Sequence, residues 1–314
     1  MDNEENSLTP SEADTTPFRC GYIAIVGRPN VGKSTLMNHL LGQKVSITSR
    51  KPQTTRHRIL GILSRDAWQM IFVDTPGIHH NAPRAINRYL NQTATTALSG
   101  VDHTLMVVDV RHWERDDDLV LQRLQNEKCA VTLIVNKIDK LEDRDELLPR
   151  LKALGQRYPF AAMIPISALR EEDCHHVEQA LVASLPEGEA IFPPDSLTDR
   201  SERFLAAEIV REKLMRSLGM ELPYAVTVEI ETFTEEEGVY HINALIWVER
   251  ESQKRIVIGK GGAVLKTVGS AARKDMQRLF GAKIYLRLWV KVKEGWSDSE
   301  RMLQSLGYGG GDRD

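Results

Sequence analysis

The chain has 314 residues, of which 41% are hydrophobic and 27% charged, and its formal net charge is −3. This length and composition favour a globular protein of two domains and exclude a disordered or fibrous chain. Three scattered cysteines are too few for a disulfide framework. A reduced, cytoplasmic compartment fits these cysteines best. No apolar run approaches the roughly 18 residues of a membrane-spanning helix, so we expect any membrane contact to be peripheral.

Residues 1–17 are polar and acidic, lack the features of a signal peptide, and are expected to form a disordered tail. From about Gly21 to Pro186, short apolar strands alternate with segments of helical character. This alternation predicts an α/β domain with a doubly wound, mostly parallel sheet and ligand loops at the carboxyl ends of the strands. The expected strands are Tyr22–Val26, Met70–Val73, Thr104–Val108, Val131–Val135 and Met163–Ile166.

A glycine-rich loop with the pattern GxxxxGK[ST] follows the first expected strand and precedes a helix. Gly27 and Gly32 allow the backbone N–H groups to turn inward on phosphate oxygens. Lys33 is expected to reach the β- and γ-phosphates, and the Ser34 hydroxyl to ligate Mg²⁺. A plain connecting turn is much less favoured in this context, so we expect a nucleoside triphosphate to contact Gly27, Arg28, Pro29, Asn30, Val31, Gly32, Lys33, Ser34 and Thr35.

A second motif, Asn-Lys-x-Asp, directly follows the strand that ends at Val135. The carboxylate of Asp139 can accept hydrogen bonds from both N1–H and the exocyclic amine of guanine, which predicts GTP rather than ATP. Asn136 and Lys137 would brace the loop. A weaker base-contacting element follows a later strand and comprises Ser167, Ala168 and Leu169.

Two further segments are expected to sense the γ-phosphate. Asp74 would hold Mg²⁺, and the N–H group of Gly77 would contact the phosphate, within a loop of Asp74, Thr75, Pro76, Gly77 and Ile78. The polar segment Ser49–Arg58 contains Thr54 and Thr55, either of which could complete the Mg²⁺ shell. We favour Thr55, and an ordinary surface loop is the alternative for this segment.

These five elements, in this order, resemble the Era and tRNA-modification group of GTPases. Ras-like GTPases place a glutamine where this chain has Ile78, whose apolar side chain cannot orient the attacking water. By resemblance to the group, Asn30 is a candidate for holding a K⁺ ion near the developing β–γ charge. The expected catalytic residues are Lys33, Thr55, Gly77 and Asn30, with slow intrinsic turnover.

Residues 189–200 are rich in Pro, Glu, Asp and Ser and are expected to link a GTPase domain at 18–188 to a second domain at 201–296. Asp199 and Glu202 can cap a helix that continues to about Leu218. The expected elements after it are strands Tyr224–Thr232 and Val239–Glu249, a glycine loop at Gly259–Gly262, a helix from Ala263 to about Leu279, and a strand at Lys283–Val292.

The second domain is strongly basic. Residues 251–293 hold eleven basic and two acidic residues, a net charge of +9, which leaves −12 for the rest of the chain. This asymmetry favours a polyanion as the partner of this domain, although a solvated, salt-bridged face is the alternative.

The glycine loop within this basic stretch favours nucleic acid, because small residues let a phosphate backbone approach closely. The order of elements resembles a type II KH domain, which clamps about four unpaired nucleotides. Trp289 is equally consistent with a core position and a stacking platform. The candidate RNA-binding residues are Lys254, Arg255, Ile258, Gly259, Lys260, Gly261, Gly262, Lys266 and Arg273.

From about Phe18 to Trp296 the chain closely resembles the Era family of bacterial ribosome-biogenesis GTPases. The resemblance implies Mg²⁺, GTP and GDP as cofactors, a monomer, and binding to the 3′ region of 16S rRNA during assembly of the small ribosomal subunit. It also implies coupling to cell growth and division and a peripheral fraction at the inner membrane. Residues 297–314 lie outside the resemblance and are expected to form a flexible tail.

Two rival functions differ in class. A GTP-dependent RNA-modifying enzyme would need an additional chemical site, for which the sequence offers no candidate. A membrane-linked regulator would use the basic face on anionic lipid, and competition between short RNA and vesicles would distinguish it from an RNA-binding protein.

Overall fold

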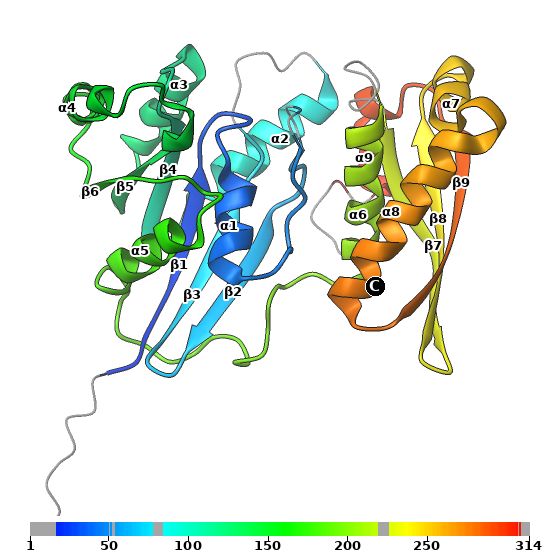
Figure 1. Cartoon of the computed structure of the whole chain (residues 1–314), viewed down its shortest axis with the longest axis horizontal. Coiled ribbons are helices and arrows are strands. Elements are labelled where there is room, and N and C mark those ends of the chain that lie inside the picture. The colour runs from blue at the N-terminus through cyan, green and yellow to red at the C-terminus, as the bar shows by residue number, and fades with distance from the viewer. Residues whose placement is uncertain are drawn as a thin grey trace, which may run out of the picture.

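The computed structural model describes residues 17–49, 51, 54–77, 84–218, 226–306 and 308. They form two domains that lie side by side, joined by an extended segment that crosses between them (Figure 1). Residues 1–16, which cover nearly all of the expected amino-terminal tail, and Ile78 lie outside the described residues. No helix in the described ranges has the length and hydrophobicity to cross a bilayer.

The first domain contains a six-stranded sheet in the order β2-β3-β1-β4-β5-β6, in which only β2 runs antiparallel. The expected mostly parallel, doubly wound sheet is therefore confirmed. We had not expected β2, whose interior carries Gly61, a residue that normally weakens a strand. A Cβ at Gly61 would lie 2.7 Å from the Leu41 side chain, so this glycine lets a helix pack closely. The strands are β1 (Arg19–Val26), β2 (Ile59–Arg65), β3 (Trp68–Asp74), β4 (His103–Asp109), β5 (Ala130–Asn136) and β6 (Ala162–Pro165).

Helices cover both faces of this sheet (Figure 1). Because strand side chains alternate, Ile23 and Ile25 of β1 enter one core with α1 and α5, while Ala24 and Val26 enter the other with α2, α3 and α4. The phosphate loop and its helix are thereby fixed on a rigid sheet. The helices are α1 (Lys33–Leu41), α2 (Ala85–Thr96), α3 (Arg115–Leu124), α4 (Leu147–Gly155) and α5 (Glu171–Val182), with short 3₁₀ turns at Ile138–Lys140 and Arg144–Glu146.

The connecting segment packs along the edge strand β2. The Ile62 N–H donates to the Leu197 carbonyl at 2.9 Å, and the Gln69 side chain donates to the Phe192 carbonyl at 2.8 Å. The first contact covers an edge that would otherwise present unpaired backbone groups, and the second ties the segment to the neighbouring strand β3. The expected cap at Asp199 is wrong, because its carboxylate accepts the Leu60 N–H at 3.1 Å and Ser201 caps the next helix instead.

The second domain follows the order helix, strand, strand, helix, helix, strand, as expected of a type II KH domain. Its sheet has the order β7-β8-β9, with β8 antiparallel to β7 and parallel to β9. Helices α6 and α8 bury their apolar sides on one face of this sheet. The elements are α6 (Glu202–Ser217), β7 (Val226–Glu236), β8 (Val239–Val248), α7 (Glu251–Ile258), a 3₁₀ turn (Lys260–Gly262), α8 (Ala263–Phe280) and β9 (Lys283–Val292).

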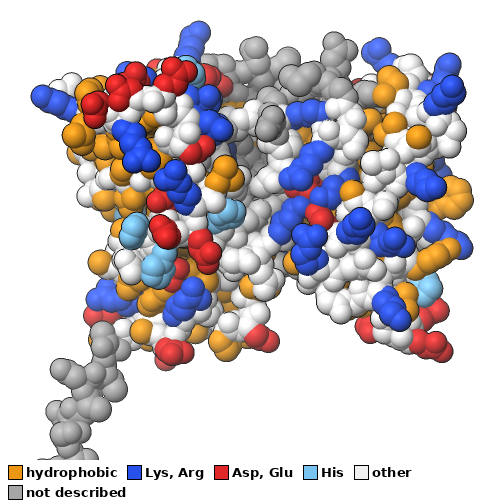
Figure 2. Space-filling model, viewed as in Figure 1, with side chains coloured by type: hydrophobic (Ala, Val, Ile, Leu, Met, Phe, Trp, Pro, Cys, Tyr) orange, Lys and Arg blue, Asp and Glu red, His pale blue; other side chains and the backbone are white. Residues whose placement is uncertain are grey.

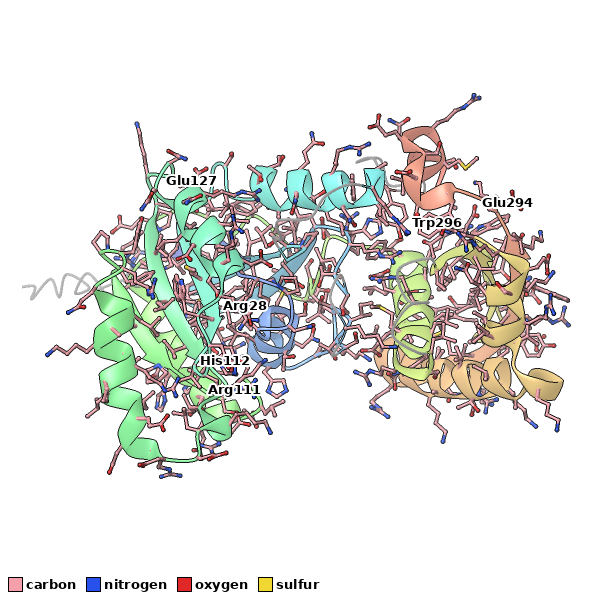
Figure 3. All side chains as sticks on the ribbon, turned by 90° about the horizontal axis from the view of Figure 1, so that it is seen from above. Arg28, Arg111, His112, Glu127, Glu294 and Trp296 are labelled. Atoms are coloured by element: carbon pink, nitrogen blue, oxygen red, sulfur yellow. The ribbon has the colours of Figure 1, made fainter. Side chains whose placement is uncertain are left out.

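Beyond β9 the chain returns to the first domain, which corrects the expected flexible tail for residues 297–306 and 308. Residues 307 and 309–314 of that tail lie outside the described residues. A 3₁₀ turn (Trp296–Asp298) and α9 (Glu300–Ser305) pack on α2, and Trp296, Leu303 and Tyr308 are buried together with Ile86 and Leu90. Figure 3 shows Trp296 at this junction. The sequence does not clearly predict α9, because its few apolar residues form a core only together with those of α2 in the first domain.

Candidate nucleotide site and nucleic-acid interface

A cavity of about 660 Å³ lies at the carboxyl ends of the parallel strands. Most of the residues expected to bind nucleotide line it. Asp74 and Val31 are instead buried next to the cavity, and Gly27, Thr75 and Pro76 do not line it. The expected residues that line the cavity are Pro29, Asn30, Gly32, Lys33, Ser34, Thr35, Thr55, Gly77, Asn136, Lys137, Asp139, Ser167, Ala168 and Leu169.

Lys33 begins α1 and is almost fully buried. Its ammonium group donates to the carbonyls of Gly27 and Arg28 at 2.9 and 3.0 Å. Burial lowers the pKa of Lys33 to about 8. Removing a cation from water in this way prepares it to pair strongly with an anion that enters the loop.

Asn136 ties together three loops that lie far apart in the sequence. Its side-chain amide donates to the Val31 carbonyl at 2.7 Å, and its side-chain oxygen accepts the N–H groups of Lys137 at 2.7 Å and Ala168 at 2.9 Å. Gly32 has φ 109°, and a Cβ there would lie 2.2 Å from the Asn136 amide nitrogen. The phosphate loop, the Asn-Lys-x-Asp loop and the Ser167–Leu169 segment therefore form one braced unit.

Three oxygen-bearing side chains converge beside the phosphate loop. The Ser34 hydroxyl donates to Asp74 at 2.8 Å and lies 2.9 Å from the Thr55 hydroxyl. Burial raises the pKa of Asp74, and its Oδ1 atom is buried with no hydrogen-bond partner. An unpartnered carboxylate oxygen next to two hydroxyls fits a small hard cation such as Mg²⁺. Thr54 instead lies 2.8 Å from the Ser49 hydroxyl.

The base end of the cavity is organised by two carboxylates. The Ser167 hydroxyl donates to Asp139 at 2.7 Å; burial opposes ionisation, but this bond and Lys140 outweigh it and the pKa of Asp139 is lowered. Asp109, which we did not predict, accepts the Lys137 ammonium at 2.9 Å. Burial also opposes its ionisation, and hydrogen bonds from Arg111 and Lys137 lower the pKa of Asp109. Asp109 directly follows the expected strand Thr104–Val108, and this position is the feature of the sequence that could have identified it.

The side chain of Arg28 leaves the phosphate loop and does not line the cavity. Its guanidinium group donates to Asp117 at 3.0 Å, pairs with Glu114 at 3.2 Å and donates to the His112 carbonyl at 3.3 Å. Figure 3 shows Arg28 near His112. Arg28 thus anchors the loop to the start of α3, and Asp117 is a structural partner that the sequence did not reveal.

The phosphate loop and the segment that begins at Asp74 touch at Gly77. A Cβ at this position would lie 2.7 Å from the Pro29 backbone nitrogen, so no larger residue fits without movement. Asn30 lies on the same loop with φ 65°, and its carbonyl accepts the Lys137 ammonium at 2.6 Å.

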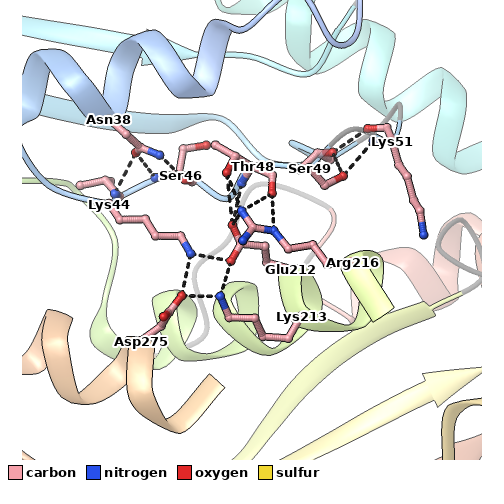
Figure 4. Close-up of polar contacts among 12 residues, drawn as sticks. Asn38, Lys44, Ser46, Thr48, Ser49, Lys51, Glu212, Lys213, Arg216 and Asp275 are labelled. Atoms are coloured by element: carbon pink, nitrogen blue, oxygen red, sulfur yellow. Dashed lines mark hydrogen bonds and ion pairs between the residues drawn. The ribbon is translucent and has the colours of Figure 1, made fainter. Parts of the chain in front are cut away.

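The segment before Thr55 contacts the KH domain through a buried carboxylate (Figure 4). Glu212 on α6 is fully buried and accepts the Thr48 N–H at 3.0 Å. Lys44 and Arg216 also donate to it. Burial opposes its charge, but these donors outweigh that effect and the pKa of Glu212 is lowered.

The segment around Thr55 makes further contacts with the KH domain. The Arg211 guanidinium group donates to the Thr54 carbonyl at 2.5 Å. On the other side of Thr55, Arg56 donates to the Val226 carbonyl at 2.9 Å. His57 stacks on Tyr308, which follows the KH domain in the chain, with ring centroids 4.7 Å apart. Thr55 therefore lies between two attachments to the second domain.

The glycine loop of the KH domain opens to solvent. Gly261 and Gly262 have φ values of 59° and 79°, and a Cβ at either would meet nothing within 4 Å. Gly259 differs, because a Cβ there would lie 2.5 Å from Val264. The first glycine is thus required for packing, and the others leave room for a close backbone approach.

A groove of about 510 Å³ begins at this loop and runs between α8 and β9. It brings together three of the expected RNA-binding residues, Gly262, Lys266 and Arg273, with Leu286 and Leu288 of β9, which we did not predict. The remaining candidates lie on α7 or in the glycine loop. Figure 2 shows Lys and Arg side chains gathered over this domain.

Comparisons with known proteins agree with this architecture. A family model described as a 50S ribosome-binding GTPase matches residues 22–137, and a KH domain model matches residues 221–297. GTPase Era from Marinobacter nauticus is 57% identical over 289 residues, which cover 92% of this chain and 95% of that protein. GTPase Era from Pseudomonas aeruginosa is 56% identical over 291 residues, which cover 93% and 95%.

The chain belongs to the Era family of GTPases. The expected resemblance is therefore confirmed, as is the combination of a GTPase domain with a KH domain. A crystal structure of Era in complex with MgGDPNP and nucleotides 1506–1542 of 16S ribosomal RNA is 37% identical, with a TM-score of 0.89 and coverage of 93% of this chain and 99% of that one. Aquifex aeolicus Era, as a variant bound to GDP and AlF4−, is 38% identical with a TM-score of 0.88 and the same coverage.

Proposed function

We propose that this Era-family chain is a GTP-operated RNA-binding switch in the assembly of the small ribosomal subunit. Its KH domain would bind the 3′ region of 16S rRNA, since a related Era is crystallised in complex with nucleotides 1506–1542 of 16S ribosomal RNA. The observation that carries the proposal is the position of Thr55 between two attachments to the KH domain. Thr55 would change position when Mg²⁺ and γ-phosphate bind, and this change would alter the neighbouring contacts with the RNA-binding domain.

Within the cavity, Ser34, Thr55 and Asp74 would hold Mg²⁺, which would neutralise charge that develops on the β- and γ-phosphates. Lys33 and the N–H group of Gly77 would act on the same oxygens. The carboxylate of Asp139 would select guanine. The short distances among the three proposed magnesium ligands support this assignment.

The attacking water needs a guide other than Ile78, which is apolar. We propose that Asn30 helps to hold a K⁺ ion beside the β- and γ-phosphates, and its place on the cavity wall supports this. Hydrolysis should then be faster in potassium than in sodium buffer. Equal turnover in the two buffers would contradict this part of the proposal.

The monomeric state, the peripheral inner-membrane fraction and the link to cell growth and division are proposals that rest on the family resemblance. The cytoplasmic location is a proposal that rests on the few, scattered cysteines. The domain limits at 18–188, 189–200 and 201–296 are proposals that rest on the composition of the linker and the order of the elements. Co-sedimentation with vesicles rich in anionic lipid would test the membrane fraction, with neutral vesicles as the control.

The RNA-binding part of the proposal is tested at the glycine loop. A double substitution, Lys260→Glu with Gly261→Glu, places two carboxylates where phosphates would approach. We expect the affinity for an RNA from the 3′ region of 16S rRNA to fall about 100-fold. The matched control is Glu142→Lys, which changes an exposed charge on the GTPase domain. Unchanged RNA affinity in the loop variant would contradict the placement of the site.

A further inference from the structure

Strand β9 separates two different surfaces of the KH domain. Leu286 and Leu288 point into the groove beside α8. Because side chains alternate along a strand, the neighbouring positions point to the opposite face of the sheet. This second face carries a row of four basic and two aromatic residues, here called the β9 outer row: Lys283, Tyr285, Arg287, Trp289, Lys291 and Lys293.

The two aromatic rings of the β9 outer row are open to solvent. Trp289 is 56% exposed and Tyr285 is 47% exposed, although their strand neighbour Ile284 is buried. The alternative of a core position for Trp289, left open by the sequence, is therefore wrong. Exposed aromatic side chains set among polar residues are typical of interaction sites.

The cations of the row lie next to aromatic rings. The Arg287 guanidinium lies 5.1 Å from the centre of the Tyr285 ring and donates to its hydroxyl at 2.9 Å. The Lys293 ammonium lies 5.3 Å from the Trp247 ring on the adjacent strand. Alternating rings and cations are what proteins use to bind single-stranded nucleic acid, because rings stack on bases and cations meet phosphates.

Charge favours RNA over a protein partner on this face. The β9 outer row contains four cations and no acid. Of the glutamates on β7, Glu229 accepts the Trp247 indole N–H at 2.9 Å, and Glu231 lies 3.6 Å from Lys291. Glu229 is thus held by Trp247, and Glu231 offsets part of the charge of Lys291. The four cations of the row still exceed this one paired acid, so the row keeps an excess of positive charge at the edge of the sheet.

We propose that single-stranded RNA leaving the glycine-loop groove passes around the edge of β9 and binds the β9 outer row. Bases would stack on Tyr285 and Trp289, and phosphates would meet Arg287 and Lys291. The two rings are four residues apart, roughly 13 Å along the strand, so each takes a separate base. The inference rests on the proposed RNA-binding function and extends it to a second surface continuous with the first.

The test compares two RNAs from the 3′ region of 16S rRNA by fluorescence anisotropy. One has about five nucleotides and fills only the groove. The other has about fifteen and keeps the same five in its middle. For Trp289→Ala we expect the affinity for the long RNA to fall about 5- to 100-fold and the affinity for the short RNA to stay unchanged.

Three further variants sharpen the test. Trp289→Phe keeps an aromatic face and should retain most of the affinity for the long RNA. Leu148→Ala removes an exposed apolar side chain from the GTPase domain and should leave both affinities as in the wild type. Arg287→Gln should lower the salt dependence of binding to the long RNA by about 0.7 in slope and leave that of the short RNA unchanged.

Each outcome separates the two proposals. Equal loss for both RNAs in Trp289→Ala would mean that the ring only supports the fold and would overturn the inference. Unchanged affinity for both RNAs would also overturn it and would leave the face to a protein partner. Failure of the wild-type protein to bind the short RNA would contradict the proposed function itself.

Discussion

The nucleotide cavity and the KH groove are built in opposite ways. Several side chains that line the cavity, such as Lys33, Thr55 and Asn136, are buried, and the single amide of Asn136 braces three of its loops. The groove has an exposed glycine loop, where a Cβ at Gly261 or Gly262 would meet nothing. A small ligand is therefore recognised by fixed geometry, whereas a long polyanion is recognised by many exposed contacts of modest strength.

The surface between the domains combines features of both regions. It contains charged groups, as the groove does, but Glu212 is fully buried, and Lys33 in the cavity is almost fully buried as well. Removing one partner from a buried cluster of charges is costly, because the others lose their compensation. We therefore expect the largest effect from a substitution in the cavity and a smaller effect from a substitution at the interface. The smallest effect should come from the titration of a single group.

Among single substitutions in the cavity, we expect the largest loss of GDP affinity from Asn136→Ala. It removes three short hydrogen bonds at once, each worth about 1 kcal/mol, so we expect GDP affinity to fall about 100-fold or more. Isothermal titration calorimetry measures this loss directly. Asn126→Ala, which alters an exposed asparagine after α3, is the control. GDP affinity within about threefold of the wild type would contradict the bracing role.

At the interface, Glu212→Gln keeps the shape of the side chain and removes its charge. Lys44, Lys213 and Arg216 then lose their shared partner. We expect the difference in RNA affinity between the GTP-like and GDP states to shrink by about tenfold. Filter binding with GDPNP or GDP measures it, and Glu142→Gln on the GTPase surface is the control. A difference as large as in the wild type would show that α6 does not carry the coupling.

The smallest effect concerns the pH dependence of nucleotide binding. Lys33 has a pKa of about 8 because it is buried. A phosphate favours its protonated form, so binding takes up a proton and GDP affinity should fall as the pH rises above 8. Between about pH 7 and pH 8.5 we expect roughly a fourfold loss. In Lys33→Arg the charge persists, so the affinity should be lower but nearly flat over this range, and equal slopes would contradict the assignment.

Local motifs allowed much of this molecule to be predicted from its sequence. The strand before Gly27 and the Asn-Lys-x-Asp loop carry their signals within a few residues, and the KH order of elements follows from hydrophobic periodicity. The missed features depend on distant partners. Strand β2 needs the Gly61 contact with α1, α9 needs the surface of α2, and Glu212 gains its importance only beside Thr48.

The difference between local signals and distant partners also explains why the sequence leaves the environment of Trp289 open. Its sequence neighbourhood, alternating apolar and basic residues, fits either face of a strand, and only the pairing of β9 with β8 decides which side chains are covered. Asp199 is the opposite case. Its local sequence predicts a helix cap, but its carboxylate accepts a hydrogen bond from Leu60 of strand β2 instead.

The most direct measurement is the affinity of the wild-type protein for an RNA from the 3′ region of 16S rRNA, with GDPNP and Mg²⁺ or with GDP and Mg²⁺ bound. Thr55 lies between attachments to α6 and β7, so the two nucleotides should present the KH domain differently. We predict affinities that differ at least about tenfold. Equal affinities in the two nucleotide states would contradict the central claim that the nucleotide governs RNA binding.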